Sequence, residues 1–142
     1  MIERITGVEK ALPDRDGDYL IKTQSAGFFA RVDGADSPII RLFSIVVDGV
    51  AGSPALFEAL NAINTQLAFL RAMWVRDQIL IEGELLALSA ELADFDEVCR
   101  RVAFATDRFG PELIARHGGK PFFEATKQED YDPHPPSHPG YL

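Results

Sequence analysis

The segment Ile39–Val47 is apolar on both faces of the strand that it predicts. It is rich in β-branched residues, which favour strands, and only Arg41 and Ser44 interrupt its apolar pattern. Because side chains alternate between the faces of a strand, we expect one set to hold Ile39, Phe43, Ile45 and Val47, and the other to hold Ile40, Leu42 and Val46. Such a strand is either central and covered on both faces, or one face awaits a partner.

The elements around this segment predict an α+β fold. Two strand-like segments precede it, Asp18–Gln24 and Gly27–Val32, and a hairpin of Phe69–Val75 and Ile79–Leu85 follows it. Helices are expected over residues 53–68 and 94–117. The order β-β-β-α-β-β-α predicts a largely antiparallel five-stranded sheet with two long helices. Residues 1–12 carry a ragged apolar stripe interrupted by Gly7, which allows a short N-terminal helix.

The two helices have recognisable end signals. Ser53 is expected to cap the first helix and Pro54 to occupy its first position, where a missing N–H costs nothing. Asp94 is expected to cap the second helix, with Glu97 in the capping-box position. Gly110 and Pro111 should kink or restart that helix.

The chain divides into one domain and a tail. Its 142 residues suit a single domain, for which we expect residues 1–119. Residues 120–142 concentrate proline among acidic and polar residues, which predicts an extended or disordered tail. Phe122 and Phe123, with Tyr131 and Tyr141, would allow parts of this tail to dock on a surface.

The charge of the chain limits its partners and its location. A formal net charge of −8 disfavours nucleic acid and anionic membranes, and suits a partner with basic segments. The N-terminus has charges where a signal peptide has an apolar core. No apolar run approaches the roughly 20 residues that span a bilayer. We therefore expect a cytoplasmic protein that binds neither nucleic acid nor membranes.

The candidate chemical groups have simpler structural explanations. Glu82 and Glu84 share one face of a strand, as paired catalytic carboxylates do, but Arg71 across the hairpin favours a solvated ion-pair surface. Cys99 lies beside the apolar stripe of its helix and is expected to be a buried filler. His134 and His138 lack further ligands at metal-site spacing. We predict no catalytic residue, no cofactor and no metal.

Several segments resemble the YbjN-like domains, which are grouped with type III secretion chaperones as peptide-binding chaperones. The strand segments from Asp16–Ile21 to Ile40–Phe43 are similar to the opening of these domains. The most specific match is Ser53–Asn64, which resembles the family's S-P-x-L-x-x-x-L-N-x-x-N helix. Phe69–Trp74 is similar to the strand that follows. The resemblance covers residues 16 to 119 and implies a dimeric, ATP-independent chaperone-like fold without catalytic residues. The family's first helix is represented here only by the short segment 1–12.

The favoured hypothesis is a homodimeric, peptide-binding chaperone or adaptor. The alternatives are a regulatory or signalling domain that pairs with a folded partner, and a small enzyme that uses Glu82 or Glu84. We expect an extended client to bind the sheet face opposite the helices, where one side-chain set of the Ile39–Val47 strand should stay accessible. The client-binding candidates are Ile40, Leu42, Phe43 and Val46.

The apolar stripe of the first helix is broad, because Phe57 and Asn64 flank its core positions. A broad stripe is found at subunit interfaces, although packing within one subunit explains it equally well. The candidate residues for a homodimer interface are Phe57, Leu60, Ile63, Asn64 and Leu67.

Overall fold

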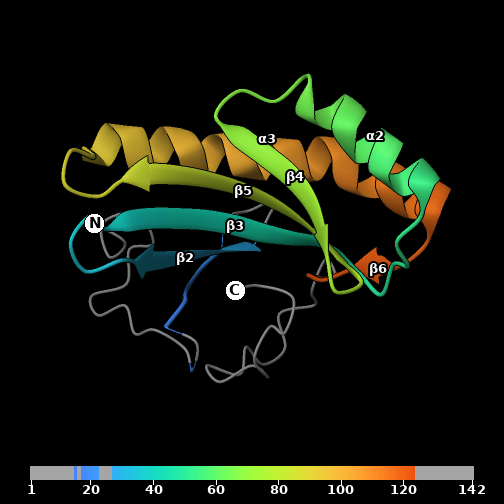
Figure 1. The fold of residues 1–142 in the computed structure, drawn as a ribbon, viewed down its shortest axis with the longest axis horizontal. Coiled ribbons are helices and arrows are strands. Elements are labelled where there is room, and N and C mark those ends of the chain that lie inside the picture. Colours follow the sequence, from blue (N-terminus) through green and yellow to red (C-terminus); the bar gives the residue numbers. More distant parts are fainter. Residues whose placement is uncertain (1–14, 16, 23–26, 124–142) are drawn as a thin grey trace.

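The computed structural model describes residues 15, 17–22 and 27–123. Figure 1 shows a twisted antiparallel sheet with helices beside it. The elements follow in the order β1 (Tyr19–Lys22), β2 (Gly27–Asp33), β3 (Ile39–Asp48), α2 (Pro54–Asn64), β4 (Leu70–Val75), β5 (Gln78–Leu86), α3 (Leu92–His117) and β6 (Lys120–Pro121). The predicted α+β class, the antiparallel sheet and the two helices are confirmed. The possible N-terminal helix falls outside the described residues.

The sheet places β3 at its centre. Its strand order is β1-β2-β3-β5-β4, every pairing is antiparallel, and β6 pairs with the end of β3. The register shifts between Ile45 and Val47, where Val46 is the extra residue of a bulge. Val47 therefore lies on the same side as Val46, in the core beneath the helices. The prediction that Val47 shares a face with Phe43 and Ile45 is wrong for this reason.

Both helices cover the same face of the sheet (Figure 1). Leu56 and Leu60 of α2 and Phe109 of α3 share one apolar cluster with Val47 and Ile79 of the sheet. Nearer the start of α3, Phe95, Val98 and Val102 pack with Leu42. An arrangement with one helix on each face is therefore not found, and the opposite face of β3 has a different cover.

The helix boundaries differ from the predicted ones. Ser53 caps α2 by accepting a hydrogen bond from the Leu56 N–H at 3.1 Å, as expected. The N-cap of α3 is Glu91, which forms a capping box with Asp94 at the third helical position. The predicted cap at Asp94 is wrong because Asp94 has the reciprocal role in that box. The helix continues through Gly110 and Pro111 without restarting.

The predicted hairpin is present, and a two-residue loop joins β4 to β5. Arg76 and Asp77 form it with φ angles of 46° and 63°, the left-handed pair that a type I′ turn requires. This turn fixes the register in which Arg71 lies opposite Glu82 and Ala72 opposite Ile81.

A glycine in β5 allows α3 to approach the sheet. A Cβ atom added at Gly83 would lie 2.6 Å from Val98 Cγ1 and 2.8 Å from Leu70 Cδ2. Neither distance is compatible with van der Waals packing. Gly83 therefore sets how closely α3 lies over β5.

The side chain of Asn64 closes part of the edge of β4. Its Nδ2 donates to the Ala72 carbonyl at 3.0 Å, and its Oδ1 accepts from the Ala72 N–H at 2.7 Å. These are the main-chain groups of an edge strand that otherwise point to solvent or to another strand. The last asparagine of the motif in residues 53–64 thus replaces a neighbouring strand at one position.

Replacing Asn64 by Ala should lower the free energy of unfolding by about 1–2 kcal/mol, because two hydrogen bonds are lost. Asn61→Ala is the matched control on the same helix, where Asn61 is exposed. Urea denaturation of both variants tests this expectation. Equal stability of the two variants would contradict the role of Asn64 at the edge.

Candidate functional site

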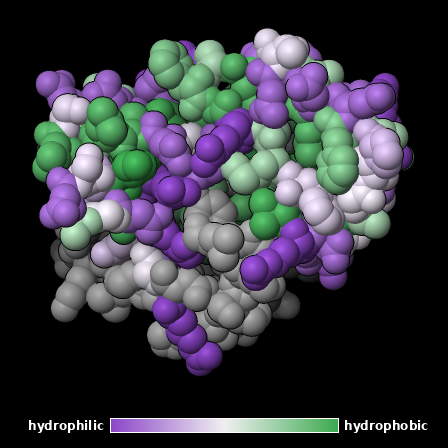
Figure 2. All heavy atoms as spheres, viewed as in Figure 1, coloured by the Kyte–Doolittle hydropathy of each residue, from purple (hydrophilic) through white to green (hydrophobic). Residues whose placement is uncertain are grey.

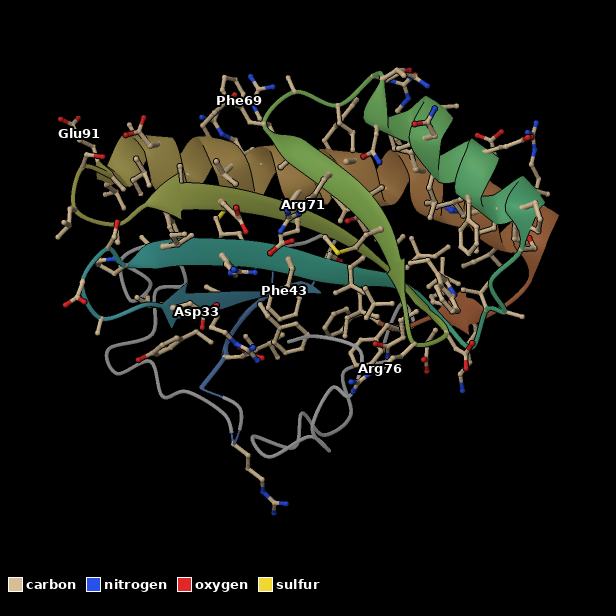
Figure 3. All side chains as sticks on the ribbon, in the orientation of Figure 1. Asp33, Phe43, Phe69, Arg71, Arg76 and Glu91 are labelled. Atoms are coloured by element: carbon tan, nitrogen blue, oxygen red, sulfur yellow. The ribbon has the colours of Figure 1, made fainter. Side chains whose placement is uncertain are left out.

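The far face of the sheet, turned away from α2 and α3, carries two different surfaces side by side. One surface is the aromatic cluster, defined as Phe29, Phe43, Ile45 and Leu80. The other is the ion-pair ladder, defined as Asp33, Arg41, Arg71, Glu82 and Glu84. Figure 3 shows Phe43 and Arg71 on this side of the sheet.

The aromatic cluster is built by cross-strand pairing. Phe29 and Phe43 lie directly opposite each other on β2 and β3, and their rings stack with centroids 5.3 Å apart. Ile45 lies opposite Leu80 in the register of β3 and β5. All four side chains are at most 2% exposed. Phe122 and Phe123, which follow β6, pack against this cluster.

In the ion-pair ladder, Glu82 and Glu84 each contact two arginine side chains. Arg71 reaches Glu82 at 2.7 Å and Glu84 at 3.0 Å, and Arg41 approaches both carboxylates at 3.5 Å. The predicted pairing with Arg71 is confirmed. The predicted solvation is wrong for Glu82, because its side chain is 1% exposed. A buried carboxylate held between two guanidinium groups is a structural ion pair and a poor general base.

A buried ion pair extends the polar surface to β1. Asp18 is fully buried and accepts two hydrogen bonds from Arg31, at 2.5 and 2.9 Å. The Arg31 guanidinium also lies 6.0 Å from the centroid of the Phe43 ring, within reach of a cation–π interaction. Arg31 therefore joins the buried charge of Asp18 to the aromatic cluster.

All four predicted client-binding residues are buried in the monomer. Ile40, Leu42 and Val46 lie in the cores beneath the helices, and Phe43 lies in the aromatic cluster of the far face. Their exposed fractions range from 0% for Leu42 and Phe43 to 9% for Ile40. The prediction that one set stays accessible is wrong, because both sides of β3 are covered within one subunit.

Of the five predicted dimer residues, four make contacts within their own subunit and one is exposed. Leu60 and Ile63 face the core of their own subunit and are 5% and 8% exposed. Asn64 binds the edge of β4 as described above, and Leu67 is partly buried against the same core. Phe57 is 48% exposed and packs edge-on against Trp74 at 5.7 Å. Among the five, Phe57 presents the largest exposed apolar surface.

Cys99 is buried in the helix-side core, as expected. Burial, with a smaller contribution from the charge of Asp96, raises the pKa of its thiol to about 12. A thiol that stays protonated at neutral pH is a poor nucleophile.

Within residues 15, 17–22 and 27–123, no group of three or more His, Cys, Asp or Glu side chains is arranged to hold a metal ion. His134 and His138 lie outside the described residues.

Neither described helix has the length and apolar character of a membrane-spanning helix.

The sequence allowed Phe122 and Phe123 to dock on a surface, but it predicted neither the strand β6 before them nor the far face as the surface they contact. Its first two residues form β6, and the following pair, Phe122 and Phe123, has partly buried rings 5.0 Å apart. The fold thus extends through Phe123, four residues past the predicted boundary. The available signal was the pair of adjacent aromatics, Phe122 and Phe123, two residues after the stop signal of Gly118 and Gly119. A cavity of about 460 Å³ opens beside Phe123, between β3 and α3.

Comparison with known proteins agrees with this architecture. One solved structure, described as the crystal structure of the ExsC–ExsE complex, contains a chain that superposes with a TM-score of 0.61. The match has 16% sequence identity and covers 78% of this chain and 86% of that chain, so it demonstrates a shared fold. No curated protein matches the chain in sequence. A family profile described as TY-Chap1, T3SS (YopN, CesT) and YbjN peptide-binding chaperone 1, matches residues 1–125. The chain therefore belongs to this family of peptide-binding chaperones.

Proposed function

We propose that the chain is a non-enzymatic chaperone or adaptor that binds an extended segment of a protein client and acts as a homodimer. The observation that carries this proposal is the family match over residues 1–125, on a chain that has the fold of the family. The chemistry of the candidate groups supports it. Glu82 is held in ion pairs with Arg41 and Arg71, and the thiol of Cys99 is buried.

The dimer is proposed to form on the side of α2 and the loop that follows it. Leu60 and Ile63 are occupied within the subunit, so the contact is assigned to Phe57 and the exposed part of Leu67. Phe69 is 81% exposed and Phe104 is 66% exposed. Phe104 and Leu67 line one groove of about 320 Å³. Apolar residues are visible along the upper edge of Figure 2, on the side where the helices lie in Figure 1.

Exposed aromatic side chains on a small monomer mark interaction surfaces when they gather in one region. Phe69 also has a φ angle of 63°, which is uncommon for a residue with a bulky side chain. The exposed position of this ring therefore comes with a strained backbone, as is found at functional sites.

Phe57→Asp is expected to shift the chain from dimer to monomer, because a carboxylate would be buried in the contact. Sedimentation equilibrium at micromolar concentration measures the change. The matched control is Leu88→Asp, because Leu88 is 81% exposed and follows β5 at the opposite end of the sheet from α2. If the wild-type chain sediments as a monomer, the proposed dimer is wrong. If the Phe57→Asp variant remains a dimer, the dimer does not form through Phe57.

Client binding is tested by selecting random 16-residue peptides on the immobilised full-length chain. We expect enrichment of peptides that combine apolar residues with Lys or Arg, because the chain has a net charge of −8. Their affinity, measured by fluorescence anisotropy, should fall as NaCl is raised from about 0.05 to 0.5 M.

Failure to enrich any peptide would contradict peptide binding. Binding only to a folded protein, with no peptide derived from it retained, would favour the regulatory domain instead.

A further inference from the structure

The last described residues of the chain fold back onto the far face. In the register of β6 and β3, Lys120 lies opposite Asp48 and Pro121 opposite Val47. The ring of Phe123 then lies 5.8 Å from the ring of Phe29, and the ring of Phe122 lies 6.4 Å from it. We define Lys120–Phe123 as the strap.

The strap occupies the position of an added strand. Because β5 pairs with β3 from Ile39 to Asp48, β2 and β6 both lie along the other edge of β3, one after the other. The strap reaches the start of β2, because a Cβ atom added at Gly27 would lie 3.0 Å from the Phe123 ring. The edge of β3 beyond β2 thus accepts an extended segment in a defined direction.

Few main-chain bonds hold the strap. Its pairing with β3 covers two residues, both exposed, and Pro121 has no N–H to donate to a ladder. The attachment therefore depends largely on the aromatic side chains, which pack on the cluster of Phe29, Phe43, Ile45 and Leu80. An aromatic pair from another segment offers the same contacts.

We propose that the aromatic cluster is the binding surface for an extended client segment with two adjacent aromatic residues, and that the strap is its internal competitor. This inference rests on the proposed function and specifies the client chemistry. The strap provides the pattern, a basic residue opposite Asp48 followed by proline and two aromatics. The cavity of about 460 Å³ beside Phe123 leaves room for a client segment to carry a bulky side chain next to its aromatic pair.

The competition is measured with a fluorescein-labelled peptide of residues 119–127 added to the full-length chain. The variant Phe122→Ser with Phe123→Ser removes the aromatic contacts of the strap. The strap is joined to α3 by only two glycines, and a linker this short gives the strap an effective concentration on the order of 1 mM at the cluster. If the peptide binds the variant with a Kd of about 0.1 mM, it should bind the wild-type chain about tenfold more weakly. The control peptide carries Ser in place of both Phe residues and should not bind.

A second variant displaces the strap without changing its aromatic residues. A side chain at Gly119 would lie 2.6 Å from Val47 Cγ1 and 2.8 Å from the Asp48 carbonyl oxygen, at a φ angle of 83°. Gly119→Val should therefore also bind the peptide more tightly than the wild-type chain. Gly49→Val is the control for backbone strain, because Gly49 has a φ angle of 71° and nothing within 4 Å of an added Cβ.

Circular dichroism confirms that each variant is folded before binding is measured. Equal affinity of the wild-type chain and both strap variants would overturn the inference, and so would equal binding of the Phe and Ser peptides. If the strap peptide fails while the random-peptide selection succeeds, peptide binding stands and only the assigned surface is wrong. If the strap peptide binds and the selection fails, the surface stands and the general client role is wrong.

Discussion

The two-sided apolar character of β3 is the constraint on which the rest of the fold depends. One side of the strand is buried beneath α2 and α3, and the other side is buried in the aromatic cluster of the far face. Dense packing on both sides requires close approach of the covering elements. Gly83 permits this approach for α3, and the bulge at Val46 turns Val47 into the helix-side core.

Two strand segments have no full neighbouring strand on one side, the edge strand β4 and the end of the central strand β3, and other parts of the chain bind both in different ways. At β4 the amide of Asn64 replaces one residue of a neighbouring strand, from a capped helix packed on the core. At β3 the replacement is a two-residue strand that follows two glycines with positive φ angles. A helical side chain therefore covers one residue of the β4 edge, whereas a two-residue strand pairs with the end of β3. This difference makes the β3 edge the better place for an exchangeable extended segment.

The far face combines apolar contact with fixed charge. Glu82 is buried between Arg41 and Arg71, and Asp18 is buried against Arg31. Charges that are paired in this way define a register, because a slip of one residue would leave a buried carboxylate without its partners. The aromatic cluster is thus bordered by charged side chains that are already paired with one another within the fold.

The sequence determined the features that depend on neighbouring residues. Alternation predicted the strands, and Ser53 with Pro54 predicted the start of α2. The sequence predicted Asp94 as the cap of α3, whereas the structure places Glu91 at that position and Asp94 three residues into the capping box. The cover of the far face and the role of Asn64 were decided by tertiary structure alone. Local patterns act within a few residues, whereas Phe122 reaches Phe29, and Asn64 reaches Ala72, only after the chain has folded back on itself.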